Sequence, residues 1–290
     1  MKALLIGADG QLGRCLRDRR PDHWDLISLA RPGLDIKDGP AVLQLADRIR
    51  PDCIINAAAY TAVDQAEREP DEAMAVNEQG AEHLALAACR IGARLVHVST
   101  DYVFDGRAAQ PYAELDAGNP INIYGQSKLL GERAVLQACP SSLVLRTSWL
   151  YSEYGSNFVK TMLRMARAAD PDAPALRVVN DQFGCPTYAG DLADAVIRLV
   201  ESQEAASGVY HYCGADILSW HEFAQEIFDC AIRLDASFRA PRLAGIPAQD
   251  YPSLADRPAY SALSCEKIEA LGIRRVSLCD ALPQAIARSI

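Results

Sequence analysis

Tyr124 and Lys128 stand four residues apart in the segment YGQSK. On a helix, residues at this spacing share one face, so the phenol and the ammonium would be neighbours. At about 5 Å and an effective dielectric of about 20, the positive charge would stabilise a phenolate by ~3 kcal/mol, which lowers the phenol pKa by about two units. Such a phenol can protonate a carbonyl oxygen as hydride reaches the carbonyl carbon. A surface amphipathic pair is the alternative interpretation.

Two hydroxyl side chains precede this pair in the sequence. Ser99 and Thr100 end the apolar segment ARLVHVST, which has the composition of a buried strand. A hydroxyl at that strand end can hydrogen-bond both the phenol and the substrate oxygen, which supports the charge that develops there. We therefore predict that Tyr124, Lys128 and Thr100 are catalytic. A simple strand-end cap is the alternative role for Thr100.

The segment GADGQLG places glycines directly after the first apolar run. Glycines at a strand-to-helix turn let the backbone approach a pyrophosphate, and free N–H groups at the helix start favour its negative charge. Gly7, Gly10 and Gly13 therefore predict a dinucleotide-binding turn. An ordinary glycine-rich turn is the alternative.

The end of the second apolar run bears on the choice of dinucleotide. A site for NAD usually carries Asp or Glu there to bind the ribose 2′-hydroxyl, but LISLARPGLD offers Ala30 and Arg31. An arginine can instead bind a 2′-phosphate. We therefore expect NADPH, with NADH possible, and expect Asp35 and Ile36 to form walls of the adenine pocket. A solvated loop cation is the alternative for Arg31.

The elements that would position these residues form a regular alternation in the first half of the chain. Apolar, β-branched runs at 2–6, 24–30, 53–59, 94–99 and 142–148 alternate with segments of helical period at 11–20, 40–50, 72–91 and 124–137. This order predicts an α/β fold with a Rossmann-like, doubly wound parallel sheet. Ligands bind at the carboxyl ends of the strands in such sheets.

The alternation loosens after residue 150, which predicts a smaller C-terminal substrate-binding lobe. We expect helices at 158–169, 189–201 and 220–232, the last capped by Ser219, and strand-like segments at 176–183 and 208–212. The polar run 169–174 and the Pro-rich stretch 240–258 should be loops. The domain division is therefore 1–150 for the dinucleotide, with later segments returning to it, and 151–290 mainly for the substrate.

Composition excludes several classes of partner. The chain has 38 acidic and 29 basic residues and a net charge of −9, which disfavours nucleic acid and anionic membranes. No apolar run reaches the ~20 residues that span a bilayer, and Met1 is followed by only a short apolar run, so we expect neither export nor membrane insertion. Nine cysteines without a CxxC pair suit the reducing cytoplasm. The five histidines form no cluster, so we expect no metal site.

Six motifs carry a resemblance to a known family: GADGQLG, INAAAYTAVDQAE, STDYVFDG, NIYGQSKLLGE, LRTSWLY and VVNDQFGCPT. In this order and over nearly the whole chain, they resemble the dTDP-4-dehydrorhamnose reductase family of the extended short-chain dehydrogenase/reductase superfamily. The resemblance implies NAD(P)H-dependent reduction of the C4 ketone of a dTDP-4-dehydro-6-deoxy-L-mannose. The product would be dTDP-L-rhamnose, a precursor of bacterial surface polysaccharide.

The resemblance also implies roles for individual residues. Tyr124 would donate the proton, Lys128 would tune it and bind the nicotinamide ribose, and Thr100 would adjust its pKa. The implied pyrophosphate contacts are Gly10, Gln11 and Leu12, and the implied cofactor and sugar contacts are Ala59, Tyr60 and Thr61. The implied sugar-nucleotide contacts are Thr100, Asp101 and Trp149, with Val63, Tyr102 and Arg257 as weaker candidates.

Two positions depart from the family pattern. Some members bind magnesium at a dimer interface, but this chain has Cys15 and Gly190 where the acidic ligands would be expected. A thiol and a bare backbone are poor ligands for a hard cation. We therefore expect no magnesium, and a monomer or weak homodimer.

Related activities on the same scaffold remain as alternatives. Sugar 4,6-dehydratases carry Thr-Asp-Glu after the fourth strand, whereas this chain has Tyr102 at the third position. An epimerase and a non-catalytic, NADP-binding regulatory subunit are the other candidates. The complete set of Thr100, Tyr124 and Lys128 favours an enzyme.

Overall fold

A six-stranded parallel sheet forms the larger part of the computed structural model, which describes residues 1–170 and 174–288. The order β10-β5-β4-β3-β1-β2 reverses direction between β1 and β3, as in a doubly wound sheet. The strands are β1 (Lys2–Ile6), β2 (Asp25–Leu29), β3 (Cys53–Asn56), β4 (Arg94–Thr100), β5 (Leu143–Thr147) and β10 (Gly208–His211). The predicted α/β fold is confirmed, with strand ends shifted by at most three residues.

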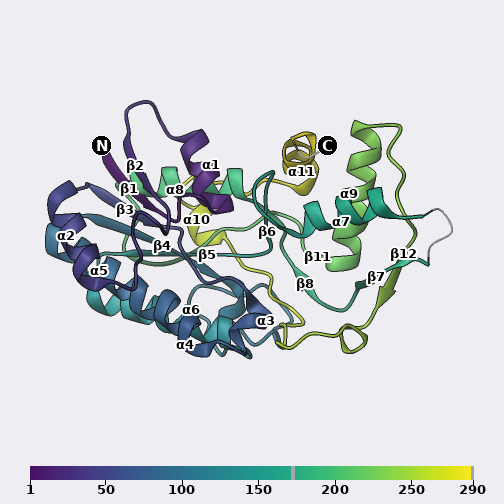
Figure 1. Ribbon diagram of the computed structural model, residues 1–290, viewed down its shortest axis with the longest axis horizontal. Helices are drawn as coiled ribbons and strands as arrows, with labels where there is room; N and C mark the ends of the chain where they lie inside the picture. The colour runs from purple at the N-terminus through teal and green to yellow at the C-terminus, as the bar shows by residue number, and fades with distance from the viewer. Residues whose placement is uncertain (171–173, 289–290) are drawn as a thin grey trace.

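Helices cover both faces of this sheet (Figure 1). The helices α1 (Gln11–Arg19) and α8 (Ala189–Glu201) pack together, as do α2 (Gly39–Ile49) with α5 (Gly80–Ile91) and α5 with α6 (Ile123–Ala138). Successive strand residues point to opposite faces, so Leu5 and Ile55 join the α1/α8 core, whereas Leu4 and Ile54 join the α2/α5 core. This double burial explains why the strands are apolar throughout rather than alternating with polar residues.

The single helix expected at 72–91 is three elements. These are α4 (Pro70–Met74), a π-helical turn η1 (Ala75–Gln79) and α5, and the short α3 (Val63–Ala66) precedes them. The π turn holds Asn77, whose buried side chain binds groups outside its own helix. Single π turns inside α-helices occur often at functional sites, and periodicity alone does not reveal them.

A smaller lobe packs beside the sheet at the right of Figure 1. Its helices are α7 (Phe158–Ala168), α9 (Trp220–Leu234) and α11 (Leu278–Ala287), which share one apolar core. Ser219 begins α9 with a full capping box, as predicted. The remaining elements are β6 (Leu150–Tyr151), β8 (Phe183–Gly184), β9 (Thr187–Tyr188), β11 (Leu218–Ser219), α10 (Glu266–Glu269) and the short turns η2 (Asp101–Val103) and η3 (Ala248–Asp250).

Two expectations for this lobe need correction. The Pro-rich stretch 240–258 contains a strand, β12 (Leu243–Ile246), which pairs in parallel with β7 (Leu176–Val179). Its partner lies more than sixty residues away, so the local sequence gives no sign of the pairing. The strand expected at 176–183 divides into β7 and β8, and the polar run 169–174 lies partly outside the described residues. No helix in the described part of the chain combines the length and apolarity needed to cross a membrane.

Candidate active site

Three cavities follow the carboxyl ends of the sheet strands. We call them the glycine-turn cavity (about 330 Å³), the central cavity (about 510 Å³) and the aromatic cavity (about 400 Å³). The first two adjoin each other, because Asp9, Gly10, Ala57 and Ala59 line both. The predicted site residues divide among them, with Gly7, Gly10, Arg31, Asp35, Ile36, Ala59 and Tyr60 in the first, Gln11, Leu12, Thr61, Thr100, Asp101, Tyr124, Lys128 and Trp149 in the second, and Val63, Tyr102 and Arg257 in the third.

The glycine turn has the close packing that its sequence predicts. Gly7 adopts φ +86°, and a Cβ there would lie 2.6 Å from the backbone nitrogen of Ala58. Gly13 lines no cavity, but a Cβ there would lie 2.2 Å from the Gly7 carbonyl oxygen. Gly10 caps α1 without a side-chain hydrogen bond, so N–H groups of the first turn remain available to an anion.

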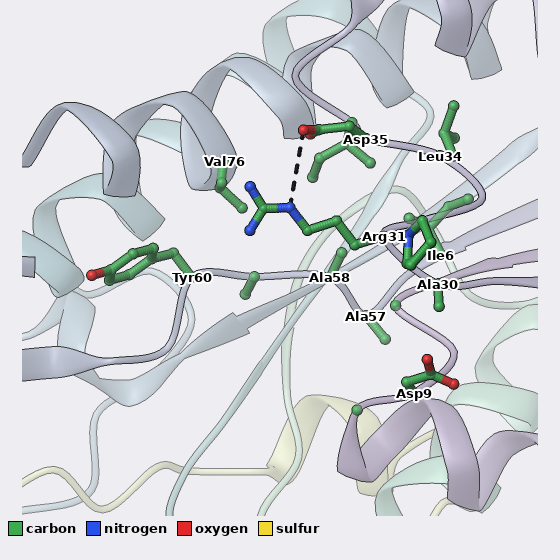
Figure 2. A pocket seen from close by; sticks show the side chains of 15 residues that line it. Ile6, Asp9, Ala30, Arg31, Leu34, Asp35, Ala57, Ala58, Tyr60 and Val76 are labelled. Atoms are coloured by element: carbon green, nitrogen blue, oxygen red, sulfur yellow. Dashed lines mark ion pairs between the residues drawn. The ribbon is translucent and has the colours of Figure 1, made fainter. Parts of the chain in front are cut away.

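Arg31 reaches across the glycine-turn cavity toward Asp35, as Figure 2 shows. Its side chain is 70% exposed, with Nε 4.0 Å from Asp35 Oδ2 and Nη2 3.3 Å from Glu72 Oε1. Lys37 Nζ binds the same Glu72 carboxylate at 3.0 Å. Sequence reasoning missed Lys37 and Glu72, because the two come from separate segments. The two cations and two carboxylates form a polar patch at the rim of the cavity.

Tyr124 lies at the start of α6, and Lys128 lies one turn further along the same face of the central cavity. Burial raises the pKa of Tyr124 to about 12, and the nearby Asp101 adds to this, while a hydrogen bond with Thr100 opposes it. Burial lowers the pKa of Lys128 to about 8, and the carboxylate of Glu132 opposes this. Lys128 Nζ donates to the Val98 carbonyl oxygen at 2.7 Å.

The expected lowering of the Tyr124 pKa by Lys128 is therefore wrong for this structure. Burial of the phenol raises its pKa, and the ammonium of Lys128 donates to a backbone carbonyl and is not among the groups that shift the Tyr124 pKa. A phenol with this pKa is protonated at neutral pH, which is the form that a proton donor needs. An alkoxide is a stronger base than a phenolate, so the transfer from Tyr124 remains favourable.

Thr100 caps the turn that follows β4 and lines the central cavity together with Tyr124. Its Oγ1 caps η2 by accepting the Tyr102 N–H at 3.2 Å, and the hydroxyl lowers the pKa of Tyr124. The same hydroxyl donates to Asp101 Oδ1 at 3.0 Å. Asp101 Oδ2 accepts a hydrogen bond from Ser261 Oγ at 2.5 Å. No motif pointed to Ser261, because it follows Asp101 by 160 residues.

Asn77 is a further residue that sequence reasoning missed. Its Oδ1 accepts the Tyr60 N–H at 2.8 Å, and its Nδ2 donates to the Tyr60 carbonyl oxygen at 3.0 Å and to Ser127 Oγ at 2.9 Å. Ser127 in turn donates to the Tyr124 carbonyl oxygen at 2.8 Å. Gly131 allows α6 to approach this turn, since a Cβ there would lie 2.0 Å from the Asn77 carbonyl oxygen.

The aromatic cavity combines flat apolar side chains with guanidinium groups. Trp220 lines it and stacks on Trp149 of the central cavity, with ring centroids 3.4 Å apart. Trp149 adopts φ +44°, and Gly184 leaves room for its indole. Arg257 lines the same cavity and is held by Asp64 at 2.7 Å. An aromatic surface beside arginines suits a nucleobase joined to phosphate groups.

Cys15 and Gly190 both lie beside Arg19, and neither has a side-chain oxygen that could bind a metal ion. Burial raises the pKa of the Cys15 thiol to about 12. A Cβ at Gly190 would lie 2.6 Å from Arg19 Nη2, so a guanidinium occupies that space. Among residues 1–170 and 174–288, no three His, Cys, Asp or Glu side chains converge as a metal site would require.

Comparison with known proteins gives consistent matches over the full chain. Residues 1–290 match the family described as RmlD substrate binding domain. A dTDP-4-dehydrorhamnose reductase of Aggregatibacter actinomycetemcomitans is 45% identical over 280 residues, which cover 94% of each chain.

Solved structures agree with the sequence matches. A dTDP-4-dehydrorhamnose reductase of Clostridium acetobutylicum is 36% identical, with a TM-score of 0.92 and coverage of 99% of both chains. Another from Bacillus anthracis, in complex with NADP, is 37% identical, with a TM-score of 0.91 and coverage of 99% of this chain and 98% of that chain.

Proposed function

This chain belongs to the family described as RmlD substrate binding domain, and on that premise we propose that it reduces the C4 ketone of dTDP-4-dehydro-L-rhamnose to dTDP-L-rhamnose with NADPH. The observation that carries the proposal is the meeting of Tyr124, Lys128 and Thr100 in one cavity that adjoins the glycine-turn cavity. A proton donor therefore faces the place where a dinucleotide would end.

The residues around the glycine turn fit a dinucleotide. The uncapped first turn of α1 supplies N–H groups for the pyrophosphate, and glycine at positions 7 and 13 keeps the backbone close. Arg31 and Lys37 supply positive charge for a 2′-phosphate, which favours NADPH while NADH remains possible. Asp35 and Ile36 line the same cavity as walls for the adenine. The cofactor would supply the hydride, and the chain supplies binding, orientation and the proton.

Three residues perform the proton chemistry in this proposal. Tyr124 donates its phenolic proton to the ketone oxygen, because burial keeps the phenol protonated at neutral pH. Thr100 lies in the same cavity as the phenol and hydrogen-bonds the developing alkoxide. Lys128 binds the nicotinamide ribose with an ammonium whose lowered pKa reflects its burial. Asp101 and Trp149 hold the sugar from the other walls of the central cavity.

The aromatic cavity would hold the thymidine diphosphate of the substrate. Val63 and Tyr102 line it together with Trp220, and Arg257 supplies a guanidinium for the diphosphate. Residues 1–150, with α8 and β10 returning to the sheet, would form the dinucleotide domain, and most of 151–290 would form the substrate lobe. The nine free cysteines support a cytoplasmic location. The Cys15 and Gly190 positions support a monomer or weak homodimer without magnesium.

A turnover assay tests the proposal directly. Wild-type protein should consume NADPH, and NADH more weakly, only when dTDP-4-dehydro-L-rhamnose is present, and the product should be dTDP-L-rhamnose. Tyr124→Phe should lower kcat by roughly 10²- to 10⁴-fold and still bind NADPH. Tyr212→Phe is the matched control, because it removes a buried phenol outside the three cavities. Wild-type protein that produces no loss of reduced-nicotinamide absorbance above a no-enzyme control would refute the proposal.

A further inference from the structure

The segment 248–257, which we call the strap, connects the smaller lobe to two helices that follow strands of the sheet. It runs from β12 back to α3, as the yellow-green part of the ribbon shows in Figure 1. Asn122, which caps α6, donates from Nδ2 to the Asp256 carbonyl oxygen at 2.7 Å. Asp64 of α3 contacts the strap as well and lies 2.7 Å from Arg257, which lines the aromatic cavity. Side chains from two helices therefore fasten the strap beside that cavity.

The two carboxylate oxygens of Asp64 have different partners. Oδ1 accepts the backbone N–H groups of Leu254 and Ala255, each at 3.1 Å, and lies 3.1 Å from Ser253 Oγ. Oδ2 accepts Arg257 Nη2 at 2.7 Å, and Nη1 lies 3.4 Å from Oδ1. The hydrogen bond from Arg257 lowers the pKa of Asp64 to about 2, so the carboxylate is ionised at neutral pH. One oxygen thus caps the turn of the strap, and the other holds the guanidinium.

Asp64 and the strap occupy only one edge of the Arg257 guanidinium. Besides its contact with Asp64, Nη1 donates to Ser253 Oγ and to the Ala255 carbonyl oxygen, the latter at 3.3 Å. A guanidinium carries five N–H groups in a planar fork. The Nε hydrogen and the second Nη2 hydrogen lie along another edge, which these contacts leave unused. That edge suits the oxygens of a diphosphate, which a guanidinium can bind through two parallel hydrogen bonds.

Holding Arg257 in place has a benefit and a cost for anion binding. An arginine side chain that moves freely must lose its rotamer freedom when it binds a ligand, and the contacts to Asp64 and Ser253 restrict it beforehand. The same carboxylate repels a diphosphate, but Asp64 is 46% exposed, so water screens the repulsion. The Arg257 side chain is only 23% exposed and reaches the cavity itself. The arrangement therefore favours positioning over repulsion.

We infer that Asp64 is a positioning residue for the sugar nucleotide: its Oδ1 holds the strap, and its Oδ2 presents the Arg257 guanidinium to the diphosphate. The inference rests on the proposed function, in which Arg257 binds that diphosphate. Asp64 contacts Arg257 and does not line the central cavity, where the proton is transferred. Binding of the sugar nucleotide, rather than the reduction step, should therefore depend on Asp64.

Equilibrium binding of dTDP and of NADPH to the full chain separates positioning from a general effect. Both ligands carry a diphosphate, but only dTDP should contact Arg257. Asp64→Asn keeps an oxygen for the strap and removes the acceptor of Arg257 Nη2. This variant should weaken dTDP binding about 10-fold and change the Kd for NADPH less than ~2-fold. Unchanged or tighter dTDP binding overturns the inference, and so does an equal weakening of NADPH.

The matched control for this measurement is Asp250→Asn. It removes the same charge from an exposed position on the same strap, outside the aromatic cavity. Its Kd for dTDP should stay within ~2-fold of wild type, because exposed charges at a distance contribute little. A loss in Asp250→Asn equal to that in Asp64→Asn would show that the charge of the strap region matters rather than the contact to Arg257, and would overturn the inference.

A double-mutant cycle tests whether Asp64 acts through Arg257. Arg257→Ala should weaken dTDP binding more than Asp64→Asn does, because it removes the guanidinium itself. Adding Asp64→Asn to Arg257→Ala should weaken dTDP binding by a further factor of less than ~2. Losses that multiply in the double variant would show that the carboxylate acts independently of the guanidinium, which contradicts the inference.

Kinetics test the same role during turnover. With the dTDP-sugar as substrate, Asp64→Asn should raise the KM about 10-fold and change kcat less than ~3-fold. A fall in kcat at unchanged KM would overturn the positioning role. If wild-type protein binds dTDP but does not reduce the ketone, the reductase proposal fails, while the dTDP measurements still decide this inference.

Amide hydrogen exchange tests the cap on the strap without any ligand. The amides of Leu254 and Ala255 should exchange at least ~10-fold faster in Asp64→Ala, which removes both oxygens, than in wild type or in Asp250→Asn. Asp64→Asn should stay close to wild type, because its amide oxygen can accept the same N–H groups. Equal exchange in Asp64→Ala and wild type would overturn the role of Oδ1.

Discussion

The guanidinium of Arg146 binds the carboxylate of Glu132 through two parallel contacts deep inside the molecule. Arg146 Nη2 lies 2.7 Å from Glu132 Oε2, and Nε lies 2.9 Å from Oε1. The two side chains are only 5% and 3% exposed. Glu132 also accepts the Ser99 hydroxyl and stands one helical turn after Lys128, whose pKa it raises. The carboxylate that Arg146 holds in place therefore favours the charged form of Lys128.

Replacing Glu132 with Gln should destabilise the fold by about 3–5 kcal/mol, because a buried guanidinium would lose its counter-charge. Urea unfolding at neutral pH measures this. Asp47→Asn is the matched control, since its pair with Arg90 is largely exposed and should contribute less than ~1 kcal/mol. A Glu132→Gln loss as small as the control would contradict the structural role of the pair.

Replacing Lys128 with Met should stabilise the protein at pH 7 while abolishing turnover. Burial lowers the folded-state pKa of Lys128 to about 8, from 10.5. Below the folded pKa both states are charged and the burial cost is fully present, up to about 3 kcal/mol. Between the two pKa values the unfolded state binds the extra proton, so wild-type stability rises with pH. The advantage of Lys128→Met in urea unfolding should therefore shrink from pH 8 upward, and a constant difference would argue against the lowered pKa.

Replacing Arg31 with Ala should weaken NADPH more than NADH. The guanidinium is largely exposed and is shared with Asp35 and Glu72, so its contribution to a 2′-phosphate should be modest. We expect the KM for NADPH to rise about 5- to 10-fold and the KM for NADH to change little. Arg90→Ala serves as the control, because it removes an exposed arginine far from the cavities. An equal rise in the KM values for NADPH and NADH would show that Arg31 does not bind the 2′-phosphate.

Replacing Gly184 with Ala should weaken the sugar nucleotide selectively. A Cβ at Gly184 would lie 2.4 Å from the Trp149 indole, so the indole must leave its stack on Trp220. The KM for the dTDP-sugar should rise about 10-fold, because stacking between aromatic rings contributes on the order of 1 kcal/mol. The KM for NADPH in the same variant is the internal control. A parallel rise in both KM values would indicate a general distortion instead.

Local patterns in the sequence were sufficient for the parts of the fold that are determined locally. The five apolar runs correspond to β1 to β5, of which β1, β3, β4 and β5 are largely buried between the two helix layers, while the edge strand β2 is partly buried. The breakers in the sequence end the helices close to the expected positions. Ser219 began α9 because its hydroxyl and the Glu222 carboxylate satisfy each other's backbone N–H groups. Residue type and spacing also predict that Tyr124, Lys128 and Thr100 lie together, and the three residues line one cavity.

Features that depend on distant partners could not be found this way. The strand β12 exists because β7 offers it a parallel edge, and Ser261 reaches Asp101 only after the chain has closed. Burial is also a property of the whole fold. For this reason the pKa of Tyr124 is raised by burial, whereas the spacing of Tyr124 and Lys128 alone predicts a lowered pKa.

The side chain of Asn77 joins three segments that sequence alone keeps apart. Its amide binds both backbone groups of Tyr60 and the hydroxyl of Ser127, which rests on the carbonyl of Tyr124. The loop after β3 and the first turn of α6 are therefore fastened to the same rigid plane of atoms. Displacing one segment therefore strains the hydrogen bonds to the other, which couples the part of the cavity wall at Thr61 to the part at Tyr124.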